Sequence, residues 1–259
     1  MSDSRDSYSH TRYRHLIAWP ARLQREGPLL ERVLSAGPVR RVLDLGSGPG
    51  DHARFLASRG FAVTGLDASE KMLESAREDG ETPNVEFVLG DFRRIPEFVK
   101  GTYGGAICLG NALPHITSEE EMRAVAKGLA RVLEPGAHFL LQILNYDRVF
   151  MDNQRAMPIN VAPDPDAPGL EAVLIRVMKP MDDGRVLFFP TSLRLDPDAE
   201  EPITVISSKR IELRGWRRTD IAAIFGDEGI VESEALGSFD GAAFDPGSSR
   251  DLIWIGRRQ

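Results

Sequence analysis

VLDLGSGPG, residues 42–50, joins an apolar run to three alternating glycines. The apolar run predicts a β-strand, and the glycines predict a loop that leads into a helix starting near Asp51. Alternating glycines let the backbone adopt positive φ and approach a ligand closely, and the first N–H groups of the helix point into the same space. The stretch therefore predicts a nucleotide-cofactor site at the end of this strand.

Two kinds of cofactor suit such a loop, and Asp44 distinguishes them. A dinucleotide fingerprint has the spacing G-x-G-x-x-G and holds an anionic pyrophosphate, whereas this chain has G-x-G-x-G with an acid inside the strand end. S-adenosylmethionine carries an ammonium and a sulfonium but no phosphate, so this acid attracts it and would repel a pyrophosphate. The loop favours S-adenosylmethionine, and the alternative is a simple strand-to-helix turn with no ligand.

Two further strand ends carry acids. FAVTGLD, residues 61–67, is a short apolar strand that ends in Asp67, where a carboxylate can grip a ribose diol. The alternative for Asp67 is a cap for the helix that follows. VEFVL, residues 85–89, precedes Gly-Asp-Phe at 90–92, which offers a carboxylate to the adenine amino group and an aromatic beside the ring. Ligands of open α/β sheets bind outside the carboxyl ends of the strands, so all three ends should converge.

In this order and spacing, the three segments resemble the successive motifs of class I S-adenosylmethionine-dependent methyltransferases, over most of residues 39–145. The resemblance implies an α/β fold with a doubly wound, mostly parallel, seven-stranded Rossmann-like sheet and a final antiparallel hairpin. It implies S-adenosylmethionine as cofactor and S-adenosylhomocysteine as product. The residues expected to bind the cofactor are Trp19, Arg22, Asp44, Gly46, Ser47, Gly48, Gly50, Asp67, Ala68, Met72, Gly90, Asp91, Phe92 and Leu109.

Composition limits the partners. The 259 residues are 42% hydrophobic and 27% charged, which is ordinary for a globular chain, and the net charge of −7 leaves no basic surface for a nucleic acid. The one cysteine, Cys108, lies in an apolar run and suits a reducing, cytoplasmic location. No apolar run is long enough to span a membrane, and the five histidines show no metal-ligand spacing.

Alternating strand and helix patterns over residues 40–145 indicate a parallel sheet. Ser118 and Glu121 form a capping-box pattern at the start of one helix, and Pro135-Gly136 precedes the next strand. We expect strands near 41–45, 61–66, 84–89, 104–109 and 137–144, with helices near 51–59, 69–78 and 118–132.

After Tyr146, four prolines punctuate a loop, and the strand patterns that follow predict an inserted antiparallel sheet. Its strands are expected at 172–178, 185–189 and 203–213; a helix near 216–227 and strands near 229–236 and 251–256 then complete the main sheet. The expected domains are an N-terminal helical cap at 1–38, an S-adenosylmethionine-binding core at 39–147 and 214–259, and an insertion at 148–213. The insertion is expected to cover the acceptor pocket as a lid, and the alternative is a contact in a homodimer.

LGNALPH, residues 109–115, and LQILNYD, residues 141–147, end the fourth and fifth strands and should face the methyl group. Both segments are similar to the glycine and sarcosine N-methyltransferase group, in which an arginine directly before Asn-Tyr-Asp binds the carboxylate of the amino acid. This chain has Leu144 there, which offers no charged hydrogen bond. Glycine is therefore disfavoured as the acceptor unless Arg176 or Arg194 of the insertion supplies the charge.

Candidate catalytic residues at these two ends are Asn111, His115 and Tyr146, although a lone histidine more often satisfies a local hydrogen bond. The residues expected to contact the acceptor are Asn111, Leu144, Asn145, Tyr146 and Arg176. Near the N-terminus, Tyr8, Tyr13, Trp19 and Arg22 are similar to residues that close over the cofactor in the same group. The alternative for Arg22 is the solvent face of an amphipathic helix over about 21–35.

Methyl transfer from a sulfonium is an in-line displacement, so positioning the acceptor accounts for much of the rate. A neutral amine needs no base during the attack, whereas a hydroxyl does. Because no clear base is present, we expect methylation of a small-molecule amine nitrogen. The alternatives are an O-methyltransferase of a small metabolite, an inactive S-adenosylmethionine-binding subunit, and a nicotinamide-dependent oxidoreductase, against which Asp44 argues.

Overall fold

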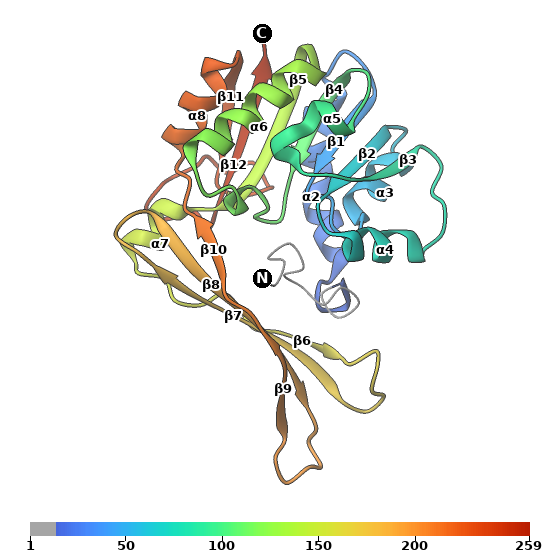
Figure 1. The fold of residues 1–259 in the computed structure, drawn as a ribbon, viewed down its shortest axis with the longest axis vertical. Coiled ribbons are helices and arrows are strands. Elements are labelled where there is room, and N and C mark those ends of the chain that lie inside the picture. Colours follow the sequence, from blue (N-terminus) through green and yellow to red (C-terminus); the bar gives the residue numbers. More distant parts are fainter. Residues whose placement is uncertain (1–13) are drawn as a thin grey trace.

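The computed structural model describes residues 14–259, and its centre is a seven-stranded sheet (Figure 1). β12 runs antiparallel to both of its neighbours, and the remaining pairs of the sheet are parallel. This confirms the predicted doubly wound, mostly parallel α/β sheet. In spatial order the strands are β11 (Ile230–Leu236), β12 (Asp251–Arg258), β5 (Leu133–Leu144), β4 (Tyr103–Cys108), β1 (Arg41–Leu45), β2 (Ala62–Asp67) and β3 (Val85–Leu89).

Helices cover both faces of this sheet. None of the helices within residues 14–259 combines the length and apolar character needed to cross a bilayer. Tyr8 and Tyr13, expected near the cofactor, lie outside the described residues. The helices are α2 (Trp19–Ser35), α3 (Asp51–Ser58), α4 (Glu70–Glu78), α5 (Ile95–Phe98), α6 (Glu119–Val132), α7 (Tyr146–Met151) and α8 (Arg218–Asp227), with 3-10 turns η1 (Phe92–Arg94) and η2 (Leu113–His115).

Successive residues of the central strands pack on opposite faces, as a strand period of two requires. Val42 joins the core beneath α2 and α3, while its neighbour Leu43 joins the core beneath α6 and α8. The second core includes a cluster of rings in which Phe225 lies 5.3 Å from Phe139 and 5.6 Å from Trp254 between centroids. Burial on both faces fixes the register of the strands and so the place where their carboxyl ends meet.

The insertion forms a second, antiparallel sheet that projects from the body as a long arm (Figure 1). The predicted continuous strand over 203–213 is wrong, because it divides into two strands that pair in succession with β8. The break lies opposite Pro190, which has no N–H to donate to the ladder. The strands are β6 (Asn160–Pro163), β7 (Glu171–Pro180), β8 (Arg185–Leu195), β9 (Ile203–Ser208) and β10 (Ile211–Arg214).

The start of β5 also differs from the prediction, and the predicted capping box of α6 forms only in part. β5 begins at Leu133 and runs through Pro135-Gly136, with an irregular register where it pairs with β4; Gly136 takes up a φ of 85° there. α6 begins as predicted after Ser118, whose Oγ accepts from the N–H of Glu121 at 3.2 Å. The Glu121 carboxylate accepts from the N–H of Thr117 at 3.2 Å, one residue earlier than a capping box requires.

Candidate functional site

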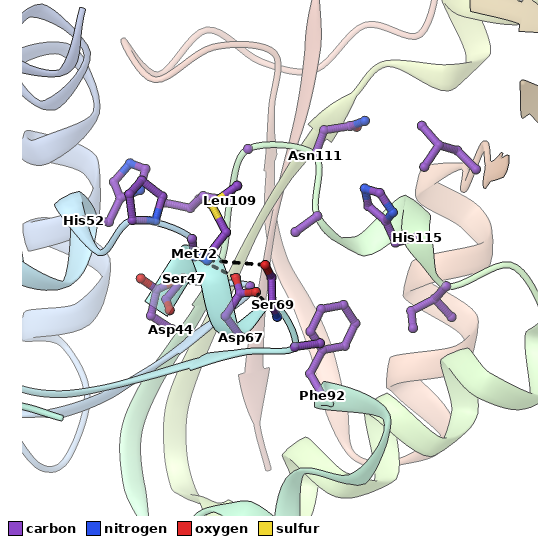
Figure 2. A pocket seen from close by; sticks show the side chains of 18 of the residues that line it. Asp44, Ser47, His52, Asp67, Ser69, Met72, Phe92, Leu109, Asn111 and His115 are labelled. Carbon is purple, nitrogen blue, oxygen red and sulfur yellow. Dashed lines mark hydrogen bonds between the residues drawn. The ribbon is translucent and has the colours of Figure 1, made fainter. Parts of the chain in front are cut away.

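A cavity of about 310 Å³ lies at the carboxyl ends of β1, β2 and β4, against the base of the inserted sheet. Figure 2 shows Asp44, Ser47, Asp67 and Met72 on one side of this cavity and Asn111 and His115 on the other. Fifteen of the predicted site residues line it: Trp19, Arg22, Asp44, Gly46, Ser47, Gly48, Asp67, Ala68, Met72, Asp91, Phe92, Leu109, Asn111, His115 and Arg176. The predicted strand ends therefore do converge on one space.

The glycine loop serves both the cavity and the packing of the sheet. Gly46, Gly48 and Gly50 all have positive φ, at 71°, 54° and 79°. The first two line the cavity, but Gly50 does not, and a Cβ at Gly50 would lie 2.3 Å from the ring of Phe87. Gly50 is thus required by the close approach of a neighbouring side chain, and its contact with the cofactor stays a prediction.

Asp44 is a buried acid whose hydrogen bonding is incomplete. Its Oδ2 and the Oγ of Ser47 are both buried and have no hydrogen-bond partner within residues 14–259. Burial, and next the charge of Asp67, raise the pKa of Asp44 to about 7. Buried polar atoms without partners are rare in proteins, so these two atoms indicate a ligand that donates to them. The ammonium of S-adenosylmethionine is such a donor.

Asp67 ends β2 and faces the glycine loop. Its Oδ2 accepts from the N–H of Gly48 at 2.7 Å, and its Oδ1 accepts from the N–H of Ser69 at 2.9 Å. Burial raises its pKa, and these backbone donors offset part of the shift. The interpretation of Asp67 as a helix cap is wrong, because Ser69 caps α4 by accepting from the N–H of Met72. With the N–H of Ala68 as a third backbone donor, the carboxylate keeps one lone pair for a ribose hydroxyl.

Asp91 lines the cavity but is already paired with Arg93, whose Nε lies 2.9 Å from both carboxylate oxygens. Burial alone would raise the pKa of Asp91, but the hydrogen bonds from Arg93 bring it below its usual value. Arg93 also reaches Glu121 at 2.6 Å. Gly90 lies outside the lining, and a Cβ there would come within 2.5 Å of Phe98.

The N-terminal wall is built by α2 and α3. The guanidinium of Arg22 lies 5.0 Å over the ring of Trp19, whose edge meets His52 at 5.2 Å between centroids. The indole Nε1 of Trp19 is buried without a hydrogen-bond partner in the described part of the chain. Two residues of this wall were not predicted: His52, which lines the cavity, and the buried Glu26 behind it.

The turn after β4 presents Asn111 to the cavity. Gly110 and Asn111 are both left-handed, with φ of 69° and 64°, and asparagine tolerates this conformation better than most residues. Asn111 Nδ2 donates to the hydroxyl of Tyr146 at 3.1 Å, and its Oδ1 accepts from the N–H of Leu144 at 3.0 Å. Tyr146 itself is buried behind the lining, and burial raises its pKa above the usual value.

His115 ends η2 and exposes its imidazole to the cavity, on the same side as Asn111 (Figure 2). Although the ring is exposed to the cavity, desolvation by the surrounding walls lowers its pKa to about 4, so it is neutral near pH 7. A neutral imidazole has one donor and one acceptor nitrogen. It can therefore orient a polar group without adding charge to this part of the cavity.

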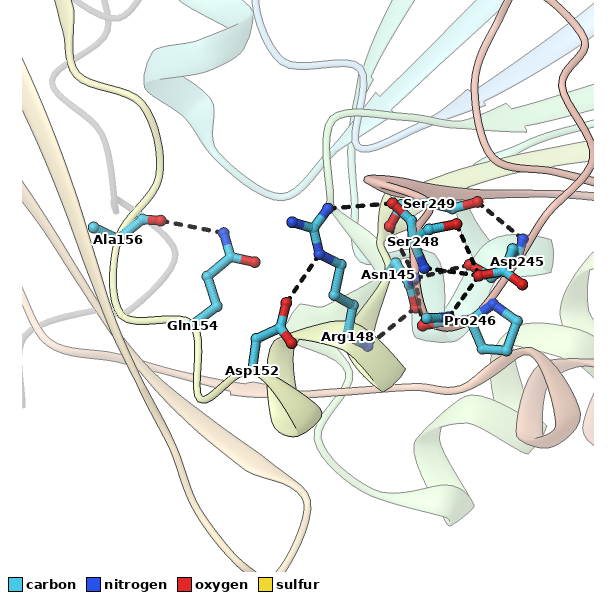
Figure 3. A network of polar contacts seen from close by, with 10 residues as sticks. Asn145, Arg148, Asp152, Gln154, Ala156, Asp245, Pro246, Ser248 and Ser249 are labelled. Carbon is cyan, nitrogen blue, oxygen red and sulfur yellow. Dashed lines mark hydrogen bonds and ion pairs between the residues drawn. The ribbon is translucent and has the colours of Figure 1, made fainter.

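Two predicted acceptor contacts, Leu144 and Asn145, are absent from the lining. Asn145 caps α7 through its Oδ1, and its Nδ2 lies within 3.4 Å of the carbonyls of Asp245, Pro246 and Ser249 (Figure 3). Its oxygen and its amide N–H groups are therefore both engaged by the fold. Asparagine directly before a helix is a common cap, a signal that the sequence offered.

The inserted sheet completes the cavity above Asn111. Arg176 of β7 lines it and donates to the carbonyl of Pro158 at 2.9 Å and to Asn160. Arg194, the other candidate cation, lies outside the lining and pairs with the buried Asp164 at 2.8 Å. The lining residues that the sequence did not predict are Pro49, His52, Ser69, Arg93, Gly110, Ala112, Ile116, Met157, Phe188 and Leu213.

Comparison with known proteins bears on the same region. A family described as a methyltransferase domain matches residues 42–136. The chain is 32% identical over 136 residues to the glycine/sarcosine N-methyltransferase of Aphanothece halophytica, covering 52% of this chain and 51% of that protein. It is 29% identical over 125 residues to human glycine N-methyltransferase, with 42% of each chain covered. The match thus spans about half the length of the curated relatives.

Solved structures extend the likeness of the fold to nearly the whole chain. An amino pentose methyltransferase from Micromonospora echinaspora is similar with a TM-score of 0.71, 22% identity and 95% coverage of each chain. A sugar N-methyltransferase from Streptoalloteichus has a TM-score of 0.70 at 17% identity, covering 100% of this chain and 94% of that one.

The sheet order, the acids at three strand ends and the methyltransferase-domain match agree with one another. The unpartnered atoms of Asp44, Ser47 and Trp19 also suit the amino-acid end of S-adenosylmethionine, which offers an ammonium and a carboxylate. The chain therefore resembles the class I S-adenosylmethionine-dependent methyltransferases in its fold and, over residues 42–136, matches a methyltransferase domain.

Proposed function

We propose that this protein transfers the methyl group of S-adenosylmethionine to an amine nitrogen of a small molecule wider than glycine. The observation that carries the proposal is the division of the cavity into two chemically different halves. One half holds the acids Asp44, Asp67 and Asp91, and the other is bordered by Asn111, His115 and apolar side chains. The first half suits the donor, and the second suits an uncharged nucleophile.

The donor half offers a partner to each part of S-adenosylmethionine, which supplies a methyl group activated by its sulfonium. Asp67 would accept from a ribose hydroxyl, and Phe92 would lie against the adenine, with Asp91 and Arg93 at its polar edge. The unpartnered Oδ2 of Asp44 would accept from the ammonium. Arg22, with the indole N–H of Trp19, would bind the carboxylate.

Among residues 14–259, the lining of the acceptor half contains no carboxylate. A protonated amine would find no counter-ion there, so the cavity favours the neutral amine, whose lone pair is the nucleophile. Asn111, held by Tyr146, would orient this nitrogen, and the neutral His115 would accept a hydrogen bond from it. A hydroxyl acceptor would need a base, and a histidine with a pKa of about 4 is a weak one.

The walls of the acceptor half favour a body larger than that of glycine. Ile116, Met157, Phe188 and Leu213 give it an apolar surface, and the last three come from the segment before β6, from β8 and from β10 of the insertion. Arg176 is the cation placed to meet an anionic group of the acceptor, in the role that the sequence assigned to it. The glycine/sarcosine and sugar N-methyltransferases named above act on nitrogen, which supports the choice of atom.

The insertion has two proposed roles, as a lid over the cavity and as a contact in a homodimer, and different parts of it suit each role. The near ends of β7, β8 and β10 carry Arg176, Phe188 and Leu213 over the cavity, which supports the role of a lid. The far end carries β9, where Ile203 and Val205 are more than half exposed. We propose that this outer end contacts a second copy of the chain in a homodimer, which light scattering coupled to size-exclusion chromatography would detect.

The proposal is tested by a screen with radiolabelled S-adenosylmethionine over glycine, sarcosine, amino sugars and apolar amines, each beside its hydroxyl analogue. We expect label in amines wider than glycine and none in the hydroxyl analogues. Asn111→Gly removes the side chain yet keeps the left-handed backbone, and should abolish transfer. Gln154→Ala, an amide outside the cavity, is the control. Labelled hydroxyls would favour an O-methyltransferase, and cofactor binding without any transfer would favour an inactive subunit.

A further inference from the structure

Glu26 is a buried carboxylate that lies behind the cavity wall, in the middle of α2. Its side chain is 2% exposed. It accepts from Arg22 Nε at 2.9 Å and from Arg25 Nη2 at 3.3 Å, and it meets His52 Nε2 at 2.7 Å. A buried carboxylate is costly unless it is paired, and here two of its partners line the cavity while Glu26 itself does not.

The protonation states of this cluster fix the direction of its hydrogen bonds. Burial would raise the pKa of Glu26, but the hydrogen bond from His52 and the charge of Arg22 bring it below the usual value. Burial lowers the pKa of His52 despite its contact with Glu26, so the ring is neutral near pH 7. An ionised carboxylate only accepts, and therefore Nε2 of His52 carries the proton and Nδ1 is left as an acceptor.

The contact with Glu26 also determines which part of Arg22 is available. Glu26 takes the Nε–H, whereas the terminal nitrogens supply the other four N–H donors. Nη2 lies close to the Gly110 turn, 3.7 Å from where a Cβ of that residue would stand. The guanidinium is thus held at its stem by Glu26, stacked on Trp19, and directed along the cavity wall.

We propose that Glu26 is a positioning residue for the amino-acid end of the donor, acting through Arg22 and His52. This inference rests on the proposed function, in which Arg22 binds the carboxylate of S-adenosylmethionine. Bidentate recognition of a carboxylate depends on the orientation of the guanidinium fork. By holding Nε of Arg22 in place, Glu26 determines how tightly the guanidinium binds the carboxylate of the donor. The alternative is that Glu26 only holds α2 against α3 and stabilises the fold.

Two ligands separate these alternatives. S-adenosylhomocysteine carries the amino-acid end, and 5′-methylthioadenosine has the same adenine, ribose and sulfur without it. Glu26→Leu should weaken S-adenosylhomocysteine about tenfold or more in calorimetric titration, and 5′-methylthioadenosine by less than about twofold. Glu26→Gln keeps an oxygen acceptor for Arg22, so it should fall between wild type and Glu26→Leu. Glu31 is a partly exposed glutamate of the same helix that pairs with Arg59, so Glu31→Gln is the control and should bind both ligands as wild type does.

A double variant tests whether Glu26 acts through Arg22. In an Arg22→Leu background, adding Glu26→Leu should change S-adenosylhomocysteine affinity by less than about twofold, because the group it positions is gone. Equal weakening of both ligands by Glu26→Leu, or additive losses in the double variant, would overturn the proposal. If Glu26→Leu does not fold, the test uses Glu26→Gln and the ratio of its affinities for S-adenosylhomocysteine and 5′-methylthioadenosine. A ratio equal to that of the wild type rejects the proposal. Failure of the wild type to bind S-adenosylhomocysteine would instead reject the proposed function.

Discussion

The amide of Asn111 donates to the hydroxyl of Tyr146 at 3.1 Å and so joins the turn after β4 to the first turn of α7. These segments lie 35 residues apart in the chain and close together at the acceptor half of the cavity. Asn111 lines the cavity, whereas Tyr146 stands behind it. The tyrosine therefore orients the asparagine, which in the proposed function contacts the acceptor.

Removing the hydroxyl in Tyr146→Phe should lower kcat/KM for the acceptor about fivefold to tenfold, because one hydrogen bond that fixes the Asn111 amide is lost. The affinity for S-adenosylhomocysteine should change less than about twofold. Tyr103→Phe is a matched control, since the buried hydroxyl of Tyr103 donates to Thr64 at 3.1 Å away from the cavity. Equal losses of activity in both variants would contradict this role of Tyr146.

Asp44 should link cofactor binding to pH. Its pKa of about 7 in the free protein means that the carboxylate is protonated as the pH falls below neutrality, and a protonated acid no longer attracts the ammonium. The affinity for S-adenosylhomocysteine should fall about tenfold between pH ~8 and pH ~6. Asp44→Asn should bind weakly with little dependence on pH in that window. A flat profile in the wild type would show that Asp44 is not the ammonium partner.

The same group should cost stability in the free protein. The pKa of Asp44 is raised from 3.8 to about 7 in the folded state, so folding favours the protonated acid. The contribution of Asp44 to the free energy of unfolding is therefore lost as the pH rises through about 7. Asp44→Asn should therefore raise the free energy of unfolding at pH ~8 by about 1–3 kcal/mol, and change it less at pH ~5. Urea unfolding at the two pH values checks this, and a variant less stable at pH ~8 would contradict it.

Asn145 is expected to be structural. Asn145→Ala removes the α7 cap and the donor shared by three carbonyls, so it should lower the free energy of unfolding by about 2–3 kcal/mol. Ser118→Ala, which removes a cap alone, should cost about 1 kcal/mol. Unchanged stability together with a raised KM for the acceptor would return Asn145 to the acceptor site.

Local patterns predicted which strand ends line the donor half of the cavity. Asp44, Asp67 and Asp91 each end an apolar run, and parallel strands bring such ends together whatever the rest of the chain does. The glycine residues of the sequence were less informative about contacts with the cofactor. Gly50 and Gly90 were expected to contact the cofactor, but they make room for Phe87 and Phe98, and a sequence does not distinguish a close ligand from a close side chain.

The acceptor half was largely unpredicted, for a physical reason. Met157, Phe188 and Leu213 reach the cavity through the folding of the inserted sheet back onto the body, which depends on long-range packing. Glu26 and His52 meet across two helices, 26 residues apart, and no local pattern predicts this contact. Asn145 had a local signal, its place directly before a helix, which the resemblance to an amino-acid-binding segment outweighed.

The proposed function requires that the transferred methyl group ends on nitrogen. Incubation with S-adenosylmethionine labelled with ¹³C in the methyl group, together with amines and hydroxyl analogues of matched shape, allows NMR to identify the atom that receives it. We expect an N–¹³CH₃ resonance and one equivalent of S-adenosylhomocysteine per methyl group, both lost in Asn111→Gly. An O–¹³CH₃ resonance, or an N–¹³CH₃ resonance of undiminished intensity in Asn111→Gly, would contradict the proposed function.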